Sequence, residues 1–134
     1  YDGALDLLAT LRAQNWLIGM ATGKSHMGVE RVFSMHPVEH YFDTVWCAED
    51  GPGKPDPFMI TQNLNAVGVV AAQSVMIGDA TFDMIMGRAA GVRTLGVSWG
   101  FGTAGELERS GADEVHHHFE TLHESLTAFA GALR

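Results

Sequence analysis

The chain has 134 residues, of which 46% are hydrophobic and 18% are charged, so it can bury a core and is not a disordered chain. Its formal net charge of −8 argues against a nucleic-acid surface or an anionic membrane surface. No apolar run is long enough to span a bilayer, and no signal peptide is visible.

The single cysteine, Cys47, excludes an internal disulfide and fits a reducing cytoplasm, which is the location we expect. Cys47 lies in the apolar run 44–48, so a packed core thiol is favoured over a nucleophile. The chain begins at Tyr1 rather than at a methionine, so we expect it to be a piece of a longer protein.

Helix and strand patterns alternate along the chain, starting with leucines at 5, 7, 8 and 11 that have the spacing of an amphipathic helix. The predicted elements, in chain order, are a helix over 4–11, a strand over 16–21, a helix through 29–33, a strand over 44–48, a helix from 57 through 64, a strand over 74–77, a helix to about 90, a strand over 94–98, a short helix near 106–109, a strand over 114–116 and a helix over 119–130. This alternation predicts an α/β fold, a doubly wound parallel sheet with helices on both faces, in one domain over 1–134.

Local signals support these elements. The runs 16–21 and 74–77 are continuously apolar, which predicts strands buried on both faces, as parallel sheets require. The loop 49–57 carries three prolines and two glycines, and Asp56 before a proline predicts a helix N-cap. Gly91 is placed to end a helix.

Two carboxylates, Asp79 and Asp83, follow the apolar run 74–77 after Gly78. This pattern places Asp79 at the carboxyl end of a strand and Asp83 in the first turn of a helix, where open α/β sheets bind ligands. Hard carboxylate oxygens there suit Mg²⁺. The alternative is that Asp79 caps the helix and Asp83 favours its positive end, and this stretch alone favours neither interpretation.

Other polar candidates also follow predicted strands. Thr22 comes after the first strand, and Lys54 lies in the proline-stiffened loop beyond the second. Because the carboxyl ends of parallel strands share one edge of a sheet, we expect these groups to converge with Asp79 and Asp83. A hydroxyl, an ammonium group and two carboxylates would form a plausible phosphate and Mg²⁺ site.

Three segments resemble the second, third and fourth motifs of the haloacid dehalogenase-like hydrolases: MATGK at 20–24, GKPDP at 53–57 and IGDATFD at 77–83. The similarity is to the phosphoglycolate-phosphatase-like branch, and it extends over nearly the whole chain, including 1–3 and 96–100. No single motif is decisive, but three in this order and spacing are specific together.

The resemblance implies a role for each matching residue. Thr22, Gly23 and Lys54 would bind the phosphate, with Thr22 on a phosphoryl oxygen and Lys54 between the phosphate and a nucleophilic carboxylate. Asp79 would bind Mg²⁺ directly, and Asp83 would support the ion or its waters. The family attacks with an aspartate and forms an aspartyl-phosphate that water hydrolyses, while a second acid protonates the leaving group.

The chain departs from the family at its amino terminus. The nucleophile motif, an aspartate-x-aspartate after an apolar strand, is absent, because Asp2 has no strand before it. In this branch the cap domain lies between the first and second motifs, so the cap would be missing as well. We therefore interpret the chain as the carboxyl-terminal part of a family core and assign no nucleophile.

The run 116–118 consists of three histidines, which could suggest a metal site. Successive residues on a strand alternate faces, so the histidines should not converge on one ion, and a solvated edge is favoured. Lys24 could add a phosphate contact, but a solvated loop lysine is favoured. The segment 22–25 is not a phosphate-binding P-loop, because position 18 is Ile where that motif needs Gly.

The remaining candidates have ordinary structural explanations. Met84 and Met86 have helix-core spacing. Glu49 and Asp50 could reach the metal, but a solvated loop is favoured for both. Trp99 and Phe101 could line a pocket mouth, but they could equally cover the end of the sheet.

Three functions remain open. The first is part of a Mg²⁺-dependent phosphatase acting on a small phosphorylated metabolite; the second is a non-catalytic remnant that binds phosphate, metal or a protein partner. The third is a metal-independent dehalogenase relative, against which the Asp79–Asp83 pair argues. The family's nucleophile strand is central in its sheet, so a chain lacking it should self-associate or exchange strands to fill the gap.

Overall fold

The computed structural model describes residues 3–100 and 102–133, which divide into two compact units, Tyr1–Val69 and Val70–Arg134. Each unit has its own sheet, and every strand pair is parallel, which confirms the predicted α/β class. Tyr1, Asp2 and Phe101, which entered the resemblance and the pocket-mouth interpretation, lie outside the described residues.

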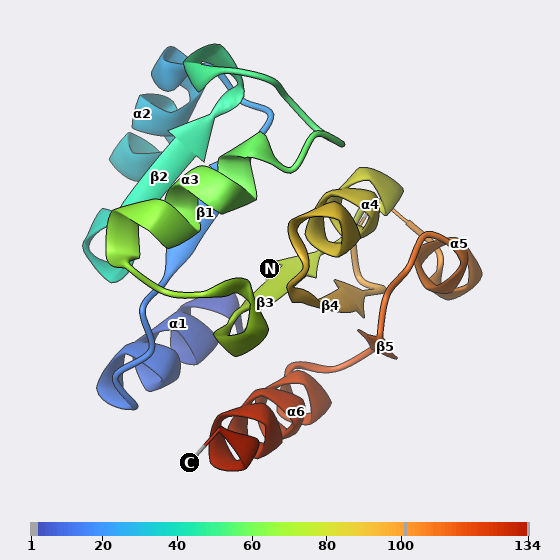
Figure 1. Cartoon of the computed structure of the whole chain (residues 1–134). Coiled ribbons are helices and arrows are strands. Elements are labelled where there is room, and N and C mark those ends of the chain that lie inside the picture. Colours follow the sequence, from blue (N-terminus) through green and yellow to red (C-terminus); the bar gives the residue numbers. More distant parts are fainter. Residues whose placement is uncertain (1–2, 101, 134) are drawn as a thin grey trace. The chain divides into compact units, whose positions relative to one another are not determined.

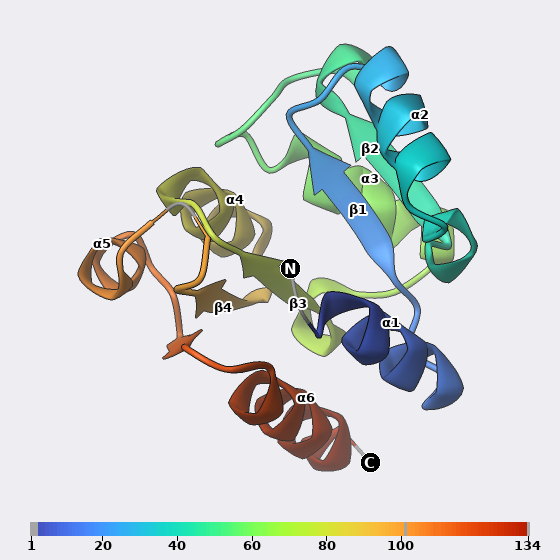
Figure 2. The same ribbon diagram turned by 180° about the vertical axis from the view of Figure 1, so that it is seen from behind.

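The first unit places two parallel strands between helices. Its elements, in chain order, are α1 (Ala4–Ala13), β1 (Gly19–Thr22), α2 (His26–Met35), the 3-10 turn η1 (Glu39–Tyr41), β2 (Thr44–Cys47), the 3-10 turn η2 (Ala48–Asp50) and α3 (Phe58–Val67). In the ladder, Gly19 pairs with Thr44 and Thr22 pairs with Cys47. α3 packs against both strands (Figure 1), and α2 lies on the other side of the sheet (Figure 2).

A side-chain cap explains where α2 begins. The hydroxyl of Ser25 accepts the N–H of Gly28 at 3.1 Å, which satisfies one of the first donors of α2. The prediction that Asp56 is the N-cap of the next helix is wrong, because α3 starts at Phe58 and its N-cap is Pro57. The carboxylate of Asp56 still accepts the N–H of Phe58 at 2.9 Å, from the residue before the N-cap.

The prediction that the first strand is buried on both faces is wrong. Gly19 is exposed, the rest of β1 is only half-buried, and Leu17 is 52% exposed. Among the described residues β1 pairs with β2 alone, so one of its edges has no strand beside it. The apolar run 16–21 therefore identified a strand, but the strand begins only at Gly19, ends at Thr22 and is less covered than predicted.

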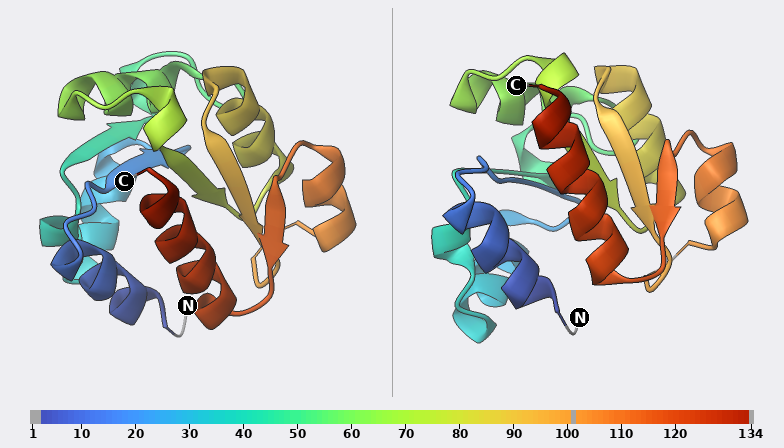
Figure 3. Two further views of the ribbon diagram at one scale, coloured as in Figure 1. Left: turned by 60° about the horizontal axis from the view of Figure 1, so that its bottom comes forward. Right: turned by 90° about the horizontal axis from the view of Figure 1, so that it is seen from below.

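The second unit is a three-stranded sheet with helices on both faces. Its elements are the 3-10 turn η3 (Ala71–Gln73), β3 (Val75–Gly78), α4 (Thr81–Ala90), β4 (Arg93–Val97), α5 (Ala104–Arg109), β5 (Glu114–His116) and α6 (Phe119–Ala132). The strand order is β3-β4-β5. α4 and α5 cover one face, and α6 covers the other (Figure 3).

The core of the second unit is made of apolar side chains from these three layers. Its most buried members, each at most 2% exposed, are Met84, Met86, Leu95, Leu107, Leu122 and Leu126. Met84 and Met86 are therefore packing residues, as predicted. Gly91 ends α4 with a φ of 78°, in the left-handed region that favours glycine, which confirms the predicted helix end.

β3, like β1, is less covered than its apolar sequence predicts. All four of its residues are half-buried rather than buried, and among the described residues it pairs only with β4.

The helices of the described chain are all too short or too polar to cross a membrane.

Candidate functional site

Asp79 directly follows β3, whose last residue is Gly78, as predicted. The turn that carries it is fixed by the backbone, because the carbonyl of Asp79 accepts the N–H of Gly102 at 2.6 Å. Gly100 lies against the Asp79 side chain: a Cβ added to Gly100 would be 2.6 Å from Cγ of Asp79. Only glycine allows the chain after β4 to approach the carboxylate this closely.

Asp83 lies in the first turn of α4, as predicted, and is only 3% exposed. Its carboxylate accepts the N–H of Ala80, the N-cap residue, at 3.2 Å. Gly78 leaves room for it, since a Cβ there would lie 2.6 Å from Cγ of Asp83. Asp83 therefore does serve the helix end, which was the alternative interpretation, and it does so while buried beside the end of β3.

Two carboxylates thus flank the turn from β3 into α4, each against a glycine. Asp79 and Asp83 supply the hard oxygen atoms that Mg²⁺ selects, so the residues present fit this ion by the chemistry of their donors.

Thr22 is the last residue of β1, at the carboxyl end of the sheet in the first unit. Its hydroxyl oxygen accepts the N–H of Lys24 at 3.2 Å, which shapes the turn into α2. Gly23 is exposed, and a Cβ there would meet no atom within 4 Å. A small anion could therefore approach the backbone of this turn and the amino end of α2.

Lys54 lies in the loop between η2 and α3 and is half-buried. The loop is held at its end by a turn, in which the N–H of Asp56 donates to the carbonyl of Gly53 at 3.0 Å. The structure thus describes Thr22, Gly23 and Lys54 in the first unit and Asp79 and Asp83 in the second.

Cys47 is 1% exposed, which confirms a packed thiol, and burial raises the pKa of this thiol. Asp50, in contrast, is not the solvated loop residue that was favoured. Its carboxylate accepts the N–H of Cys47 at 2.7 Å, and this bond is the main cause that lowers the pKa of Asp50. Glu49 accepts the N–H of His26 at 2.6 Å, so both acids hold the start of α2 near the end of β2.

The three consecutive histidines do not converge, as predicted. His116 bonds to Glu114 at 2.9 Å, and His117 contacts the hydroxyl of Ser98. The expected solvated edge is correct for His117 and His118 but wrong for His116, whose side chain is only 12% exposed. His116 is covered because it joins the ion pair of Glu114 with Arg93.

Trp99 packs at the start of α6, where the centroid of its ring lies 4.4 Å from the ring centroid of Phe119. Lys24 is exposed, as expected of a loop lysine.

The sequence patterns assigned no role to Gly100 or His26. A glycine two residues beyond the predicted strand 94–98 was the available signal for Gly100. His26 and Cys47 are 21 positions apart, and no spacing rule joins them.

The chain is similar to known proteins over most of its length. Residues 1–97 match the family described as haloacid dehalogenase-like hydrolase. The chain is 27% identical over 123 residues to a phosphoglycolate phosphatase of Aliivibrio fischeri, covering 91% of this chain and 54% of that protein. It is 28% identical over 100 residues to the pyrophosphatase PpaX of Bacillus cereus, covering 74% of this chain and 46% of that protein.

A solved structure is similar as well. A hydrolase from Pseudomonas syringae superposes with a TM-score of 0.86 at 27% identity, over 97% of this chain and 61% of that chain. The chain spans about half the length of the curated relatives it matches.

Proposed function

Because the chain belongs to the haloacid dehalogenase-like hydrolase family, we propose that it is the carboxyl-terminal part, residues 1–134, of the core of a Mg²⁺-dependent phosphatase. The observation that carries this proposal is the pair of carboxylates at the β3–α4 turn, each packed against a glycine. The family's phosphatase members among the relatives support the reaction class.

Thr22, Gly23 and Lys54 are the proposed phosphate-binding group. Thr22 and the open backbone at Gly23 offer hydrogen-bond donors to the phosphoryl oxygens. Lys54 offsets the negative charge that builds up when a carboxylate and a phosphate approach each other. Half-burial of Lys54 supports this role, since a charge that is partly removed from water acts more strongly.

Asp79 and Asp83 are the proposed ligands or supports of Mg²⁺. When bound, this ion would offset negative charge on the transferring phosphoryl group. The chain's own contribution is to hold the two carboxylates in place through Gly100, Gly78 and the N–H of Ala80.

The attacking group is proposed to be an aspartate carboxylate outside residues 1–134. Its oxygen bonds to phosphorus as the bond from phosphorus to the leaving alcohol breaks, and a second acid gives the alcohol a proton. Water then attacks the aspartyl-phosphate, which releases inorganic phosphate and restores the carboxylate. Coverage of about half of each relative supports a contribution from a further segment.

The proposed substrate is a small phosphate monoester in the cytoplasm. The names of the relatives cover both a phosphate monoester and pyrophosphate, so the two substrate classes should be compared directly. A dehalogenase relative would need no metal, and survival of activity in EDTA would favour it over a phosphatase.

The test compares p-nitrophenyl phosphate hydrolysis by the 134-residue chain with hydrolysis by the longer protein that restores an upstream family segment. We expect the chain alone to be no faster than its Asp79→Asn variant, because nothing in it initiates the attack. Adding the segment, in cis or as a separate chain, should restore Mg²⁺-dependent turnover. Hydrolysis by the chain alone that is lost in Asp79→Asn would overturn the assignment of the nucleophile, and no hydrolysis by the restored protein would favour a binding remnant.

A further inference from the structure

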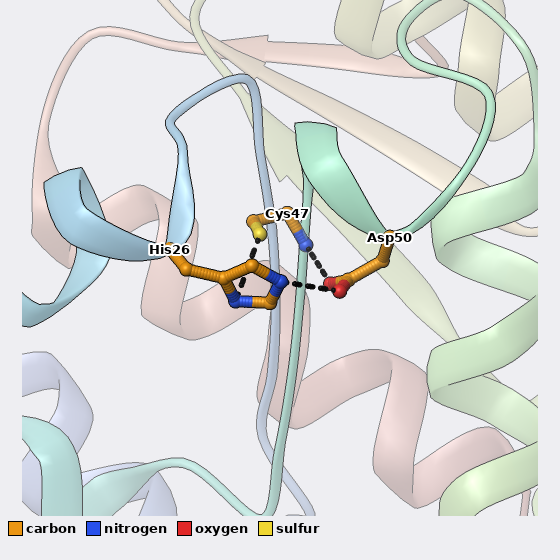
Figure 4. Close-up of side chains that lie close together, drawn as sticks. All are labelled: His26, Cys47 and Asp50. Carbon is orange, nitrogen blue, oxygen red and sulfur yellow. Dashed lines mark hydrogen bonds and ion pairs between the residues drawn. The ribbon is translucent and has the colours of Figure 1, made fainter.

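Three potential metal ligands meet at the carboxyl end of the β1–β2 sheet, within the first unit: His26, Cys47 and Asp50 (Figure 4). Nδ1 of His26 lies 3.5 Å from Sγ of Cys47, and Nε2 of the same ring lies 2.8 Å from Oδ1 of Asp50. One ligand atom from each residue lies within 4.8 Å of the other two. The parallel ladder makes this possible by ending β2 at Cys47, next to the turn that leads into α2.

We propose that His26, Cys47 and Asp50 bind a thiophilic divalent cation of the Zn²⁺ type, with water at the fourth position. Zn²⁺ takes thiolate, imidazole and carboxylate ligands in tetrahedral sites. Two ligands of one Zn²⁺, with bonds of about 2.3 Å to sulfur and about 2.0 Å to nitrogen, lie about 3.5 Å apart. The observed separation of Cys47 and His26 already has this value.

Backbone contacts hold the three residues in place before any ion arrives. The N–H of Cys47 donates to Asp50 at 2.7 Å, and the N–H of His26 donates to Glu49 at 2.6 Å. The N–H of Ala48 donates to the carbonyl of Lys24 at 3.1 Å, which joins the start of α2 to the end of β2. The backbone of the three residues is therefore already fixed. The change needed to admit an ion is a rotation of the exposed His26 ring, because Nδ1 now faces the thiol and Nε2 faces the carboxylate.

A thiol, an imidazole and a carboxylate in this order also occur in enzymes that use a cysteine nucleophile. The solvent exposure of Cys47 and of His26 argues against a nucleophilic role here. Cys47 is 1% exposed, so its sulfur is closed to a substrate. The His26 side chain is 63% exposed and can swing to admit an ion. The soft sulfur also distinguishes this site from the all-oxygen pair Asp79 and Asp83, which suits Mg²⁺. The inference is independent of the proposed phosphatase function.

The test uses Co²⁺ in place of Zn²⁺ on the untagged, reduced 134-residue chain, with Mg²⁺ in excess. A bond between Co²⁺ and a thiolate gives a charge-transfer absorption band, and Cys47 is the chain's sole cysteine, so this band reports on Cys47 alone. We expect the band to appear on titration, to disappear when Zn²⁺ is added, and to be unaffected by Mg²⁺. Zn²⁺ should also raise Tm, because it binds the folded state.

His26→Ala is the first variant, since His26 is exposed and its loss should not disturb folding. Asp50→Asn, which keeps the shape of the side chain, is the second. Each should weaken Co²⁺ binding roughly tenfold or more, because losing even an outer partner of a metal ligand costs about 10–100-fold in affinity. The matched control is the double change His117→Ala and His118→Ala, which should leave the band and the affinity unchanged.

Three results would overturn the proposal. One is the absence of a thiolate band at millimolar Co²⁺. A missing band contradicts the proposal even if the chain is unfolded without metal, because metal binding at such a site itself favours folding. Another is a band of equal affinity in His26→Ala and Asp50→Asn, which would mean that the thiol binds Co²⁺ alone. The third is loss of the band in the His117/His118 control.

Discussion

The backbone of Gly100 lies directly against the carboxylate of Asp79. Gly100 follows Trp99 in the loop after β4, and it helps to set the position of a candidate metal ligand at the end of the neighbouring strand β3. A side chain at position 100 would overlap this carboxylate. The contact makes the geometry of the site depend on a residue that supplies no ligand atom.

Gly100→Ala, made in the longer protein, should therefore raise the Mg²⁺ concentration needed for half-maximal phosphatase activity by roughly tenfold or more, as expected when the support of a ligand is disturbed. The control is Gly131→Ala in α6, where an added Cβ meets no atom within 4 Å. That change should leave the Mg²⁺ dependence intact and keep or raise stability, by up to about 1 kcal/mol. Equal Mg²⁺ dependence in both variants would contradict the role given to Gly100.

Asp79→Asn should remove most Mg²⁺ binding and lower turnover by about 10²-fold or more, because each oxygen ligand of a small divalent ion matters. The measurement is p-nitrophenyl phosphate hydrolysis over a Mg²⁺ titration in the longer protein. Glu120→Gln, an exposed acid in the first turn of α6, is the control for the lost charge and should change neither quantity. Unchanged kinetics in Asp79→Asn would remove this residue from the site.

Lys54→Ala should leave Tm close to that of the unaltered protein and lower turnover by about 10²–10³-fold, because the ammonium offsets charge in the transition state rather than packing a core. Arg31→Ala removes one positive charge from the exposed side of α2 and is the matched control. A drop in Tm that accounts for the lost activity would show that Lys54 acts on folding instead.

Arg12 and Asp43 give a pH-dependent contribution to stability. Arg12 donates to Asp43 at 2.6 Å and is the main cause that lowers the pKa of this carboxyl, with help from the N–H of Ile18. A lowered folded pKa means that the stabilisation is present above the ordinary aspartate value of about 3.9 and is lost as the pH falls through the lower folded value.

Arg12→Ala should therefore reduce the free energy of unfolding at pH 6, and the difference from the unaltered protein should shrink as the pH is lowered toward 3. Denaturant unfolding at several pH values measures this. Added salt should reduce the same difference, because both side chains are partly exposed. A difference that stays constant across this pH range would mean that Arg12 acts through packing alone.

Unpaired strand edges should make the 134-residue chain associate with itself. Among the described residues β1 pairs only with β2 and β3 only with β4, which leaves N–H and C=O groups on one edge of each. We expect dimers or larger species in analytical ultracentrifugation, formed by exchange of strands between copies. Adding the upstream segment should reduce them. A monomeric chain that melts cooperatively would contradict this prediction.

Local patterns in the sequence determined most of the elements. Apolar runs located β1 to β4, and leucine spacing and Gly91 located the start of α1 and the end of α4, because these signals depend on a residue and its near neighbours. The placement of Asp79 after β3 and of Asp83 in the first turn of α4 followed from the same local rules. Family membership also followed, from three short motifs in order.

Burial and long-range contacts were decided by the tertiary structure. The runs that form β1 and β3 are as apolar as buried strands, yet both are only half-buried, because burial depends on which elements lie beside a strand. His116 is covered by an ion pair that its neighbours in sequence do not predict. His26 meets Cys47 because the strand before α2 pairs in register with β2, and Gly100 meets Asp79 because β4 pairs with β3. These contacts join residues about 20 apart in the chain, and no spacing rule for a single helix or strand reaches that far.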